Sequence, residues 1–471
     1  MKNLTLIYLF IFSLPVMADF THAEKHYQQA EYTKSFDEYH KLAKLGNIRA
    51  QYRIAVMYFD GIGVDKNAIN AYAWSKTAGS SKSSTKELSD KIAKTLDANE
   101  FDKANTLKDQ FISNYGIIAT KTSLGPIFAE SASQHNNIFT EYGVHNDSNY
   151  NRVEINKENN AKLEYPKKAL NKSSRGWVDL YFNIYPNGKI QDISVLQQYP
   201  HELFASAAVE YVQQITFEFY LDNKRVTPNE KIISIQRFKF GEEYKSSLVG
   251  RKTKRKISEI YHSAAKGNIE DQYQYTNLFY TILNKTGMTT EKKINSWLFK
   301  ASRYGFDLAQ YRLGRNIYFG NSCIEDQQKG FDWVIRSAQR NNNKAQYFAY
   351  QILKNNPKIN NTSGKSAHEW LTTSAENNSD ISQFIVAKHI VAKDELSNQE
   401  IDLATQYLDN YAINVGKTID WYEIKIKLLI TKKQFKEAKK PLKTAIKMAK
   451  KANWDLTELT KLKNTIEQIK S

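Results

Sequence analysis

The stretch GNIRAQYRIAVMYFDGIGVDKNAINAYAWSKTAG, residues 46–79, indicates the fold of most of this chain. Ala50 and Ala78 are small, whereas Tyr58 and Trp74 are large and aromatic. Small residues let two helices approach closely, and a large ring fills the gap between neighbouring units. One helical hairpin cannot bury its own apolar face, so the pattern predicts a stack of hairpins.

The same unit recurs along the chain at a spacing of 36 and 37 residues, which separates Trp297, Trp333 and Trp370. Small residues follow each tryptophan, and a glutamine comes thirteen places after it. We interpret the aromatic residues as core packing rather than as a cofactor site. The repeated glutamines are Gln51, Gln272, Gln310, Gln346 and Gln383.

Residues 46–79 resemble the Sel-like repeat, a tetratricopeptide-like hairpin. The segment at 307–320, DLAQYRLGRNIYFG, repeats the pattern, whereas the units at 345–375 and beyond lack its Gly-x-Gly-Val turn. The resemblance implies an interaction scaffold rather than a catalyst. The residues that carry it are Ala50-Gln51, Tyr58, Gly61, Gly63-Val64, Ala71, Trp74 and Ala78.

A different pattern, YFNIYPNGKI at residues 181–190, interrupts the helical repeats near the centre. Apolar residues occupy every second place from Val178 to Ile184, which predicts a half-buried strand. Pro186-Asn187-Gly188 predicts a turn, and the apolar alternation resumes at Ile193. A helix and a third strand follow, which gives the order β-β-α-β. A hairpin alone is marginally stable and needs such partners.

This module, roughly residues 160–242, resembles the TonB C-terminal domain. It departs from the family at residues 215–219, where ITFEF replaces an aromatic-aromatic-x-Pro stretch. The resemblance implies binding of short peptide segments of outer-membrane transporters by strand addition at a sheet edge. It rests on Tyr165-Pro166, Ala169, Gly176, Val178, Phe182, Ile184, Pro186, Gly188, Ile190, Ile193, Val195, Phe204, Ala208, Phe217 and Phe240.

The third strand is the candidate edge, because an unpaired strand offers backbone hydrogen bonds to an extended peptide. The alternative is a solvated edge that its own Lys and Arg residues protect. Lys231, Gln236 and Arg237 could supply side-chain contacts. The candidate partner-binding residues are Lys231, Ile232, Ile233, Ser234, Ile235, Gln236, Arg237 and Phe238.

The first eighteen residues read as a cleaved signal peptide. Lys2 precedes an apolar run from Leu4 to Leu14, and Val16-Met17-Ala18 offers small residues for cleavage. The alternative is an uncleaved inner-membrane anchor. The other predicted segments are N-terminal Sel-like repeats at 19–120, a linker at 121–160, the TonB-like domain at 161–245, Sel-like repeats at 250–395 and C-terminal tetratricopeptide-like helices at 396–471.

The composition is that of a globular chain, with 41% hydrophobic and 25% charged residues and a net charge of +17. We interpret the charge as lysine on exposed helix faces and predict no nucleic-acid partner. The basic helix QFKEAKKPLKTAIKMAKKA near the C-terminus reads as the last, solvent-facing helix, with peripheral membrane association as the alternative. Cys323, the single cysteine, is expected to be buried and inert.

No catalytic motif is recognisable in the sequence. It lacks a nucleophile elbow, a phosphate loop and a His-Glu-x-x-His pair. His22 and His26 stand four residues apart on an expected helix, and we read them as surface residues. The sequence therefore predicts no enzyme, no metal and no cofactor.

These patterns predict a mostly α-helical chain whose Sel-like repeats flank a small α+β domain. The predicted function is that of a non-enzymatic periplasmic adapter. It would bind a transporter peptide at the strand edge and other envelope proteins through its repeats, with homodimerisation through the strands as a further option. Two alternatives stay open, a membrane-anchored TonB-type energy transducer and an envelope-assembly scaffold. Transducers of the family need a proline-rich spacer, but the eight prolines here are scattered.

Overall fold

The computed structural model forms two compact units. The first comprises Met1–Ser133, Lys245–Ala345 and Lys358–Thr362, and the second comprises Gln134–Tyr244, Gln346–Pro357 and Ser363–Ser471. The predicted signal peptide, Asn187, Gly188 and Lys231 lie outside the described residues. The structure describes residues 19–79, 83–128, 142–144, 152–155, 161–171, 176–186, 190–199, 203–221, 224–227, 232–240, 251–281, 291–452 and 454–468.

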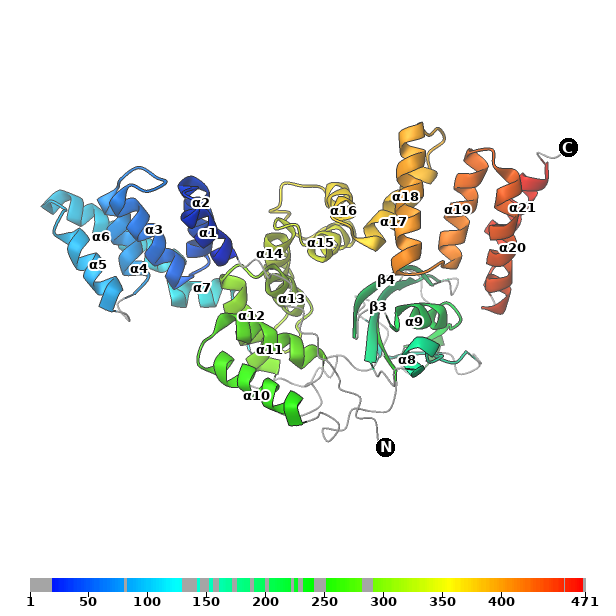
Figure 1. The fold of residues 1–471 in the computed structure, drawn as a ribbon, viewed down its shortest axis with the longest axis horizontal. Coiled ribbons are helices and arrows are strands. Elements are labelled where there is room, and N and C mark those ends of the chain that lie inside the picture. The colour runs from blue at the N-terminus through cyan, green and yellow to red at the C-terminus, as the bar shows by residue number, and fades with distance from the viewer. Residues whose placement is uncertain are drawn as a thin grey trace. The chain divides into compact units, whose positions relative to one another are not determined.

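The N-terminal part of the first unit is built from helical hairpins (Figure 1). Asn47 caps its third helix by accepting a hydrogen bond from the Ala50 amide, and Gly61 ends that helix in the left-handed conformation. Gly63 has φ of 72°, and a side chain there would come within 2.5 Å of the Tyr32 backbone. The helices are α1 (Asp19–Gln28), α2 (Tyr32–Lys44), α3 (Ile48–Asp60), α4 (Ala68–Thr77), α5 (Ser83–Ala93), α6 (Ala98–Tyr115) and α7 (Ile117–Leu124).

The central repeats of the same unit pack directly against these helices. Arg303 is buried and donates hydrogen bonds to the carbonyl oxygens of Leu45 and Gly46, while Asn47 Nδ2 donates to the Arg303 carbonyl at 3.1 Å. Both groups of repeats therefore share one core. The central helices are α10 (Arg251–Ala265), α11 (Ile269–Thr281), α12 (Glu291–Arg303), α13 (Asp307–Tyr318) and α14 (Gln327–Ala338).

The repeated glutamine links the helix that carries it to the helix before it in the chain. At four of the five positions, the side-chain amide donates to the carbonyl oxygen eight residues earlier, near the end of the preceding helix. A buried carbonyl at a helix end needs such a partner, which explains the residue type at this place. The pairs are Gln51 with Ala43 at 3.0 Å, Gln272 with Ala264 at 2.9 Å, Gln310 with Ser302 at 2.9 Å and Gln383 with Ala375 at 3.0 Å.

Small residues allow close helix packing, as the sequence indicates. A Cβ atom added to Gly330 of α14 would lie 2.7 Å from the Gly314 carbonyl oxygen of α13. Trp297, Trp333 and Trp370 are at most 4% exposed, so their interpretation as core residues is confirmed.

The second unit contains the β-strands, in two sheets. One sheet has the order β1-β7-β3-β4, and the other has the order β2-β5-β6. Each strand pair is antiparallel. The strands are β1 (Tyr142–Val144), β2 (Arg152–Ile155), β3 (Gly176–Ile184), β4 (Ile190–Tyr199), β5 (Phe217–Leu221), β6 (Lys224–Val226) and β7 (Ile232–Phe240).

Helix α9 (Ala205–Val212) covers the apolar face of the larger sheet. Tyr211 of α9 contacts Phe238 of β7 with ring centroids 5.7 Å apart, and Phe238 pairs with Val178 of β3. Phe204 stacks on Phe240 at 4.5 Å beside the short helix α8 (Lys167–Asn171). These contacts assemble the residues on which the family resemblance rests into one core.

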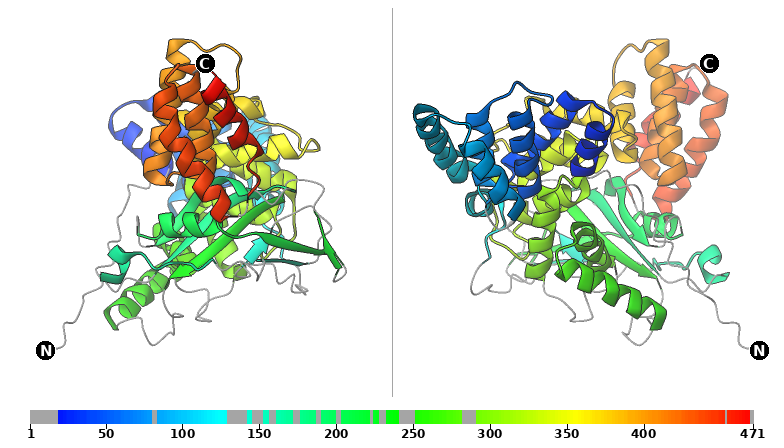
Figure 2. Two further views of the ribbon diagram at one scale, coloured as in Figure 1. Left: turned by 90° about the vertical axis from the view of Figure 1, so that its right-hand side faces the viewer. Right: turned by 60° about the vertical axis from the view of Figure 1, so that its left-hand side comes forward.

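Further helices of the second unit stand against the sheet near β4 (Figure 2). Tyr411 donates to the Ile193 carbonyl at 2.9 Å, and the Ile419 amide donates to Gln213 Oε1 at 3.2 Å. The remaining helices of the chain are α15 (Asn343–Asn355), α16 (Ala367–Glu376), α17 (Asp380–Val391), α18 (Asn398–Asn414), α19 (Ile419–Thr431), α20 (Phe435–Lys451) and α21 (Thr457–Gln468). The mostly α-helical class with a small α+β domain is confirmed.

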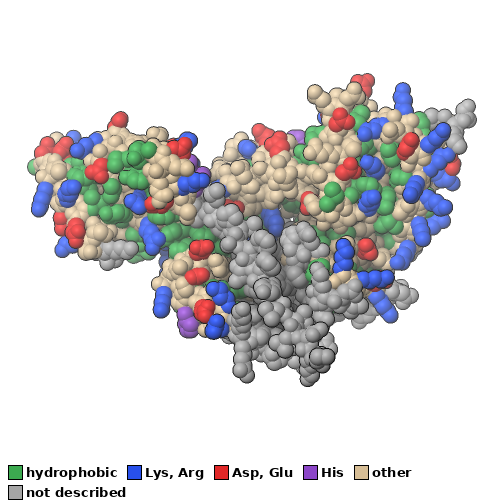
Figure 3. Space-filling view, viewed as in Figure 1, with side chains coloured by type: hydrophobic (Ala, Val, Ile, Leu, Met, Phe, Trp, Pro, Cys, Tyr) green, Lys and Arg blue, Asp and Glu red, His purple; other side chains and the backbone are tan. Residues whose placement is uncertain are grey.

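The basic helix α20 has the face that the sequence indicates. Ala438, Leu442, Ala445 and Ala449 are buried, and lysines gather on the surface over this part of the chain (Figure 3). Within the described residues, no helix is both long and apolar enough to span a membrane.

Three features of the β module differ from expectation. The predicted linker, residues 121–160, contains β1 and β2, whose three and four residues are too short to leave a sequence pattern. The strand β5 begins at Phe217, inside the stretch where the sequence departs from the family, and forms a separate sheet with β2 and β6. The prediction of a half-buried β3 is wrong, because its polar side chains are buried as well.

Candidate functional site

The predicted peptide-binding strand is β7. Along its full length it pairs with β3, from Ile232 opposite Ile184 to Phe240 opposite Gly176. On its other side it pairs with β1, where Gly143 lies opposite Ile235. The chain therefore adds a strand of its own to this edge.

The structure divides the predicted site residues into three groups. Ser234, Ile235 and Gln236 are covered by β1, so the expectation of an open edge is wrong for them. Phe238 is 4% exposed and belongs to the core under α9, which removes its side chain from surface recognition. Ile232, Ile233 and Arg237 also lie in β7, beyond the three residues that pair with β1.

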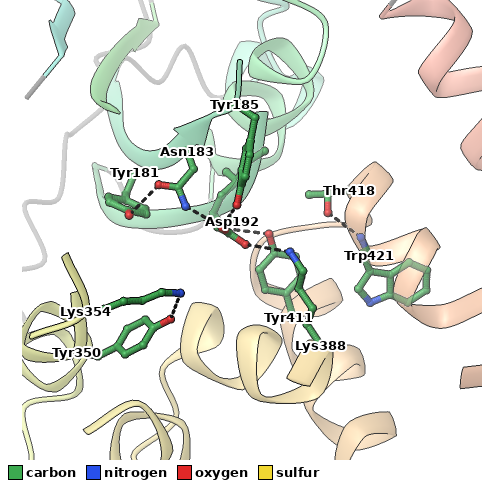
Figure 4. A network of polar contacts seen from close by, with 11 residues as sticks. Tyr181, Asn183, Tyr185, Asp192, Tyr350, Lys354, Lys388, Tyr411, Thr418 and Trp421 are labelled. Carbon is green, nitrogen blue, oxygen red and sulfur yellow. Dashed lines mark hydrogen bonds and ion pairs between the residues drawn. The ribbon is translucent and has the colours of Figure 1, made fainter. Parts of the chain in front are cut away.

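The polar face of β3 carries a buried hydrogen-bond network (Figure 4). Tyr181 and Asn183 are 4% and 3% exposed. The Tyr181 hydroxyl donates to Asn183 Oδ1 at 3.1 Å, and Asn183 Nδ2 donates to Asp192 Oδ2 at 2.6 Å. Tyr185 also donates to Asp192 Oδ2, at 3.5 Å. Buried polar groups that are satisfied in this way fix the geometry of the hairpin.

A β-bulge directs Asp192 into this network. The pairing passes from Tyr181 opposite Ser194 to Asn183 opposite Gln191, so β4 holds one extra residue there. Asp192 has φ of 55°, a left-handed conformation that Asp tolerates better than most residues. Bulges commonly re-aim a side chain in this manner.

Helices of the second unit complete the surroundings of Asp192. Lys388 Nζ of α17 lies 3.7 Å from Asp192 Oδ1.

Burial raises the pKa of Tyr181 and of Tyr185 well above the ordinary value, so both hydroxyls stay protonated. Burial also raises the pKa of Asp420 of α19 to about 8, which keeps that carboxyl largely neutral at pH 7.

Neither β1 nor the buried network is predicted from the sequence. Asp179, Tyr181 and Asn183 alternate with apolar residues, and such a pattern is typical of a strand with one face in water. The one available signal was the aromatic ring of Tyr181 on that face. It contacts Tyr347 of α15 at a centroid distance of 5.9 Å.

The site offers hydrogen bonding and charge rather than an evident nucleophile. Among the described residues, no group of three His, Cys, Asp or Glu side chains is placed to hold a metal ion. Burial raises the pKa of Cys323 to about 12, which disfavours the reactive thiolate.

Comparison with known proteins identifies the modules. The family model of the Gram-negative bacterial TonB protein C-terminal region matches residues 161–240, and the Sel1 repeat model matches residues 48–82 and 307–342. No curated protein matches the sequence.

Two solved structures are similar in part. A Sel1 repeat protein from Oxalobacter formigenes is 12% identical with a TM-score of 0.29, and the match covers 84% of this chain and 99% of that one. A protective antigen of uropathogenic Escherichia coli strains with an SLR fold is 12% identical with a TM-score of 0.31, and the match covers 96% of this chain and 83% of that one.

The TonB C-terminal match spans β3, β4, α9 and β7, and the Sel1 matches cover α3–α4 and α13–α14. Both families are interaction modules, and the first belongs to the Gram-negative envelope. The chain thus combines a TonB C-terminal domain with Sel1 repeats, and this combination points to a protein-interaction adapter of the Gram-negative envelope.

Proposed function

We propose that this chain is a non-enzymatic periplasmic adapter whose β7 edge binds an extended peptide segment of an outer-membrane transporter. The peptide would take the place of β1, and the helical repeats would hold other envelope proteins. The observation that carries the proposal is the added strand itself, because β7 already accepts an antiparallel segment along its outer side.

The size of β1 supports an exchange of strands. β1 has three residues, whereas β7 has nine. Such a short strand makes few backbone hydrogen bonds, so a longer extended peptide gains more of them on the same edge. Binding would therefore include displacement of β1.

A peptide of this chain tests the edge directly. We would label the peptide FTEYGVHND, residues 139–147, and measure its binding to the full chain by fluorescence anisotropy. Gly143→Pro removes a backbone donor from β1 and should increase binding of the added peptide. Ile233→Pro in β7 should abolish it.

The matched control is Lys224→Pro in β6, another three-residue strand, which lies in the second sheet. It should leave peptide binding unchanged. Circular dichroism of each variant checks that the chain is folded. Unchanged binding in both Gly143→Pro and a folded Ile233→Pro variant would contradict strand addition at β7.

Cross-linking in cells tests the partner. A photoreactive residue at Ser234 should capture an outer-membrane transporter, because Ser234 lies on the strand that β1 covers. Capture of other proteins alone would refute the transporter assignment while leaving the edge intact.

The proposed location rests on the apolar N-terminal run and on the envelope family of the β domain. Mass spectrometry of the protein from fractionated cells should find a chain that begins at Asp19 in the periplasmic fraction. An intact Met1 in the inner-membrane fraction would instead support an anchored transducer.

A further inference from the structure

We propose that a second binding site lies between the β3–β4 hairpin and the helices α15 and α17, and that it takes an anionic monosaccharide. A cavity of about 200 Å³ opens there within the second unit. Drug-sized ligands occupy pockets of roughly 300–1,000 Å³, so this volume limits the occupant to a small molecule.

The lining is almost entirely polar. Of its twelve residues, Ile385 alone has an aliphatic side chain. Empty cavities in proteins are apolar, whereas a polar cavity holds water or a ligand that hydrogen-bonds to its walls. Hydrogen-bonding groups reach this cavity from three elements that are distant in the sequence, as Figure 4 shows for Asn183, Lys354 and Lys388.

The base of the cavity is built from buried aromatic and amide side chains. Tyr181, Tyr347 and Tyr350 are between 4% and 7% exposed, and Gln351 is 8% exposed. The Gln351 Nε2 atom is buried, and it faces the Tyr181 hydroxyl without completing a hydrogen bond of normal geometry. A buried donor whose hydrogen bond is incomplete is costly, so this amide is suited to a ligand oxygen.

The mouth of the cavity carries a surplus of positive charge. Lys354 is exposed, and its Nζ donates to the Tyr350 hydroxyl at 3.0 Å. In the described residues no carboxylate lies within 4.0 Å of Lys354 Nζ, whereas Lys388 faces Asp192. Desolvation lowers the pKa of His389, with Lys354 as the next cause, so this imidazole is neutral at pH 7. Two lysines and one aspartate leave one uncompensated positive charge.

These groups select a hydroxylated anion over an amino acid. Asp192 already accepts hydrogen bonds from Asn183 and Tyr185 and faces Lys388, so no carboxylate is left for a ligand ammonium. Tyrosine hydroxyls and amides instead match sugar hydroxyls. A lysine ammonium donates hydrogen bonds to a carboxylate or to a phosphate alike, because it acts as a point charge. The shared chemistry is therefore a sugar ring with one acidic substituent.

The site lies on the polar face of β3, whereas the proposed peptide edge lies along β7. The two inferences rest on different residues and fail independently.

Isothermal titration of the full chain at low salt tests the site with four probes: glucuronate, glucose 6-phosphate, glucose and acetate. We expect one of the two charged sugars to bind at least tenfold more tightly than glucose and acetate. The preferred charged sugar distinguishes a carboxylate from a phosphate. Failure of both to bind at millimolar concentration would overturn the proposal, and equal binding of acetate would overturn its sugar component.

Two variants assign the binding to this cavity. Lys354→Gln should weaken binding of the charged sugar at least fivefold. The matched control, Lys440→Gln on the exposed face of α20, should leave binding unchanged. Gln351→Leu should weaken binding at least tenfold, because it removes a buried amide whose own hydrogen bonding within the chain is incomplete. Binding that both cavity variants leave unchanged would overturn the assignment.

Discussion

The two faces of β3 are both buried, but they are covered by different parts of the chain. Phe182 on the apolar face is fully buried on the side of α9 and contacts Phe217 of β5 at a centroid distance of 5.8 Å. Asn183 on the opposite face is buried among hydrogen-bonding groups and a charged pair. One face is stabilised by packing, whereas the other depends on polar partners that distant helices supply.

This contrast explains why the hairpin can combine stability with a ligand site. The apolar face needs no specific partner beyond good packing. The polar face must satisfy each buried donor and acceptor, and where this is incomplete it leaves groups for a ligand.

The largest effect is expected on the apolar face. Phe182→Ala should lower the free energy of unfolding of the second unit by about 3–5 kcal/mol, through lost burial and the cavity that remains. Hydrogen exchange of peptides covering residues 176–199 measures this unit separately from the first. Phe182→Leu is the control and should cost less, and an equal cost for both would argue against a packing role.

The second-largest effect is a pH dependence of the free energy of unfolding, and it comes from the helices that cover the opposite face. The pKa of Asp420 is raised to about 8 in the folded chain, against 3.8 as its ordinary value. The folded state therefore holds a proton that the unfolded state loses between about pH 4 and pH 8. The free energy of unfolding of the second unit should therefore fall as the pH rises from about 4 to about 8, by up to about 1.4 kcal/mol per pH unit.

Unfolding of the second unit at pH 5 and pH 7 measures this dependence. Asp420→Asn keeps the shape of the side chain without titrating, so it should flatten the decline. A slope that the variant leaves unchanged would contradict the buried, neutral state of Asp420.

A smaller loss is expected when the polar network is cut. Asn183→Leu should lower the free energy of unfolding by about 1–3 kcal/mol, because it removes a donor to Asp192 and an acceptor for Tyr181. Hydrogen exchange of the β3–β4 hairpin measures this loss of stability. The control, Gln191→Leu on the neighbouring strand, is only partly buried and should have little effect. Similar losses in the two variants would contradict a specific role for Asn183.

The smallest effect on the free energy of unfolding is expected for the ion pair between Lys388 and Asp192. Lys388→Gln should change the free energy of unfolding by less than about 1 kcal/mol, because the Lys388 side chain is 36% exposed and lies 3.7 Å from Asp192. Added salt should reduce the difference further. A loss as large as that of Asn183→Leu would show that the ion pair is part of the structural network.

The repeats were well predicted from sequence because their signal is local and periodic. The spacing of tryptophans and glutamines marks the helical hairpins, and the buried Trp333 and the amide of Gln310 confirm that both are structural. The role of the glutamine, however, required the structure. Its partner carbonyl lies eight residues away on the preceding helix, which no residue pattern identifies.

The β module was predicted in outline. Alternating apolar residues located β3 and β4, since an apolar residue at every second position is typical of a strand with one apolar face. The three-residue strands β1 and β6 escaped because so few residues carry no period. The assumption that β7 forms an open edge failed over Ser234–Gln236, because β1 lies far from it in the sequence.

The sequence by itself determined the helical repeats, the apolar face of the hairpin and the families to which these modules are similar. Each depends on periodicity within a few tens of residues. Only the tertiary structure decided that the polar face of β3 is buried, that β1 pairs with β7, and that Lys354 and Asn183 line one cavity. These features depend on contacts between distant segments, and local dihedral and burial preferences do not specify them.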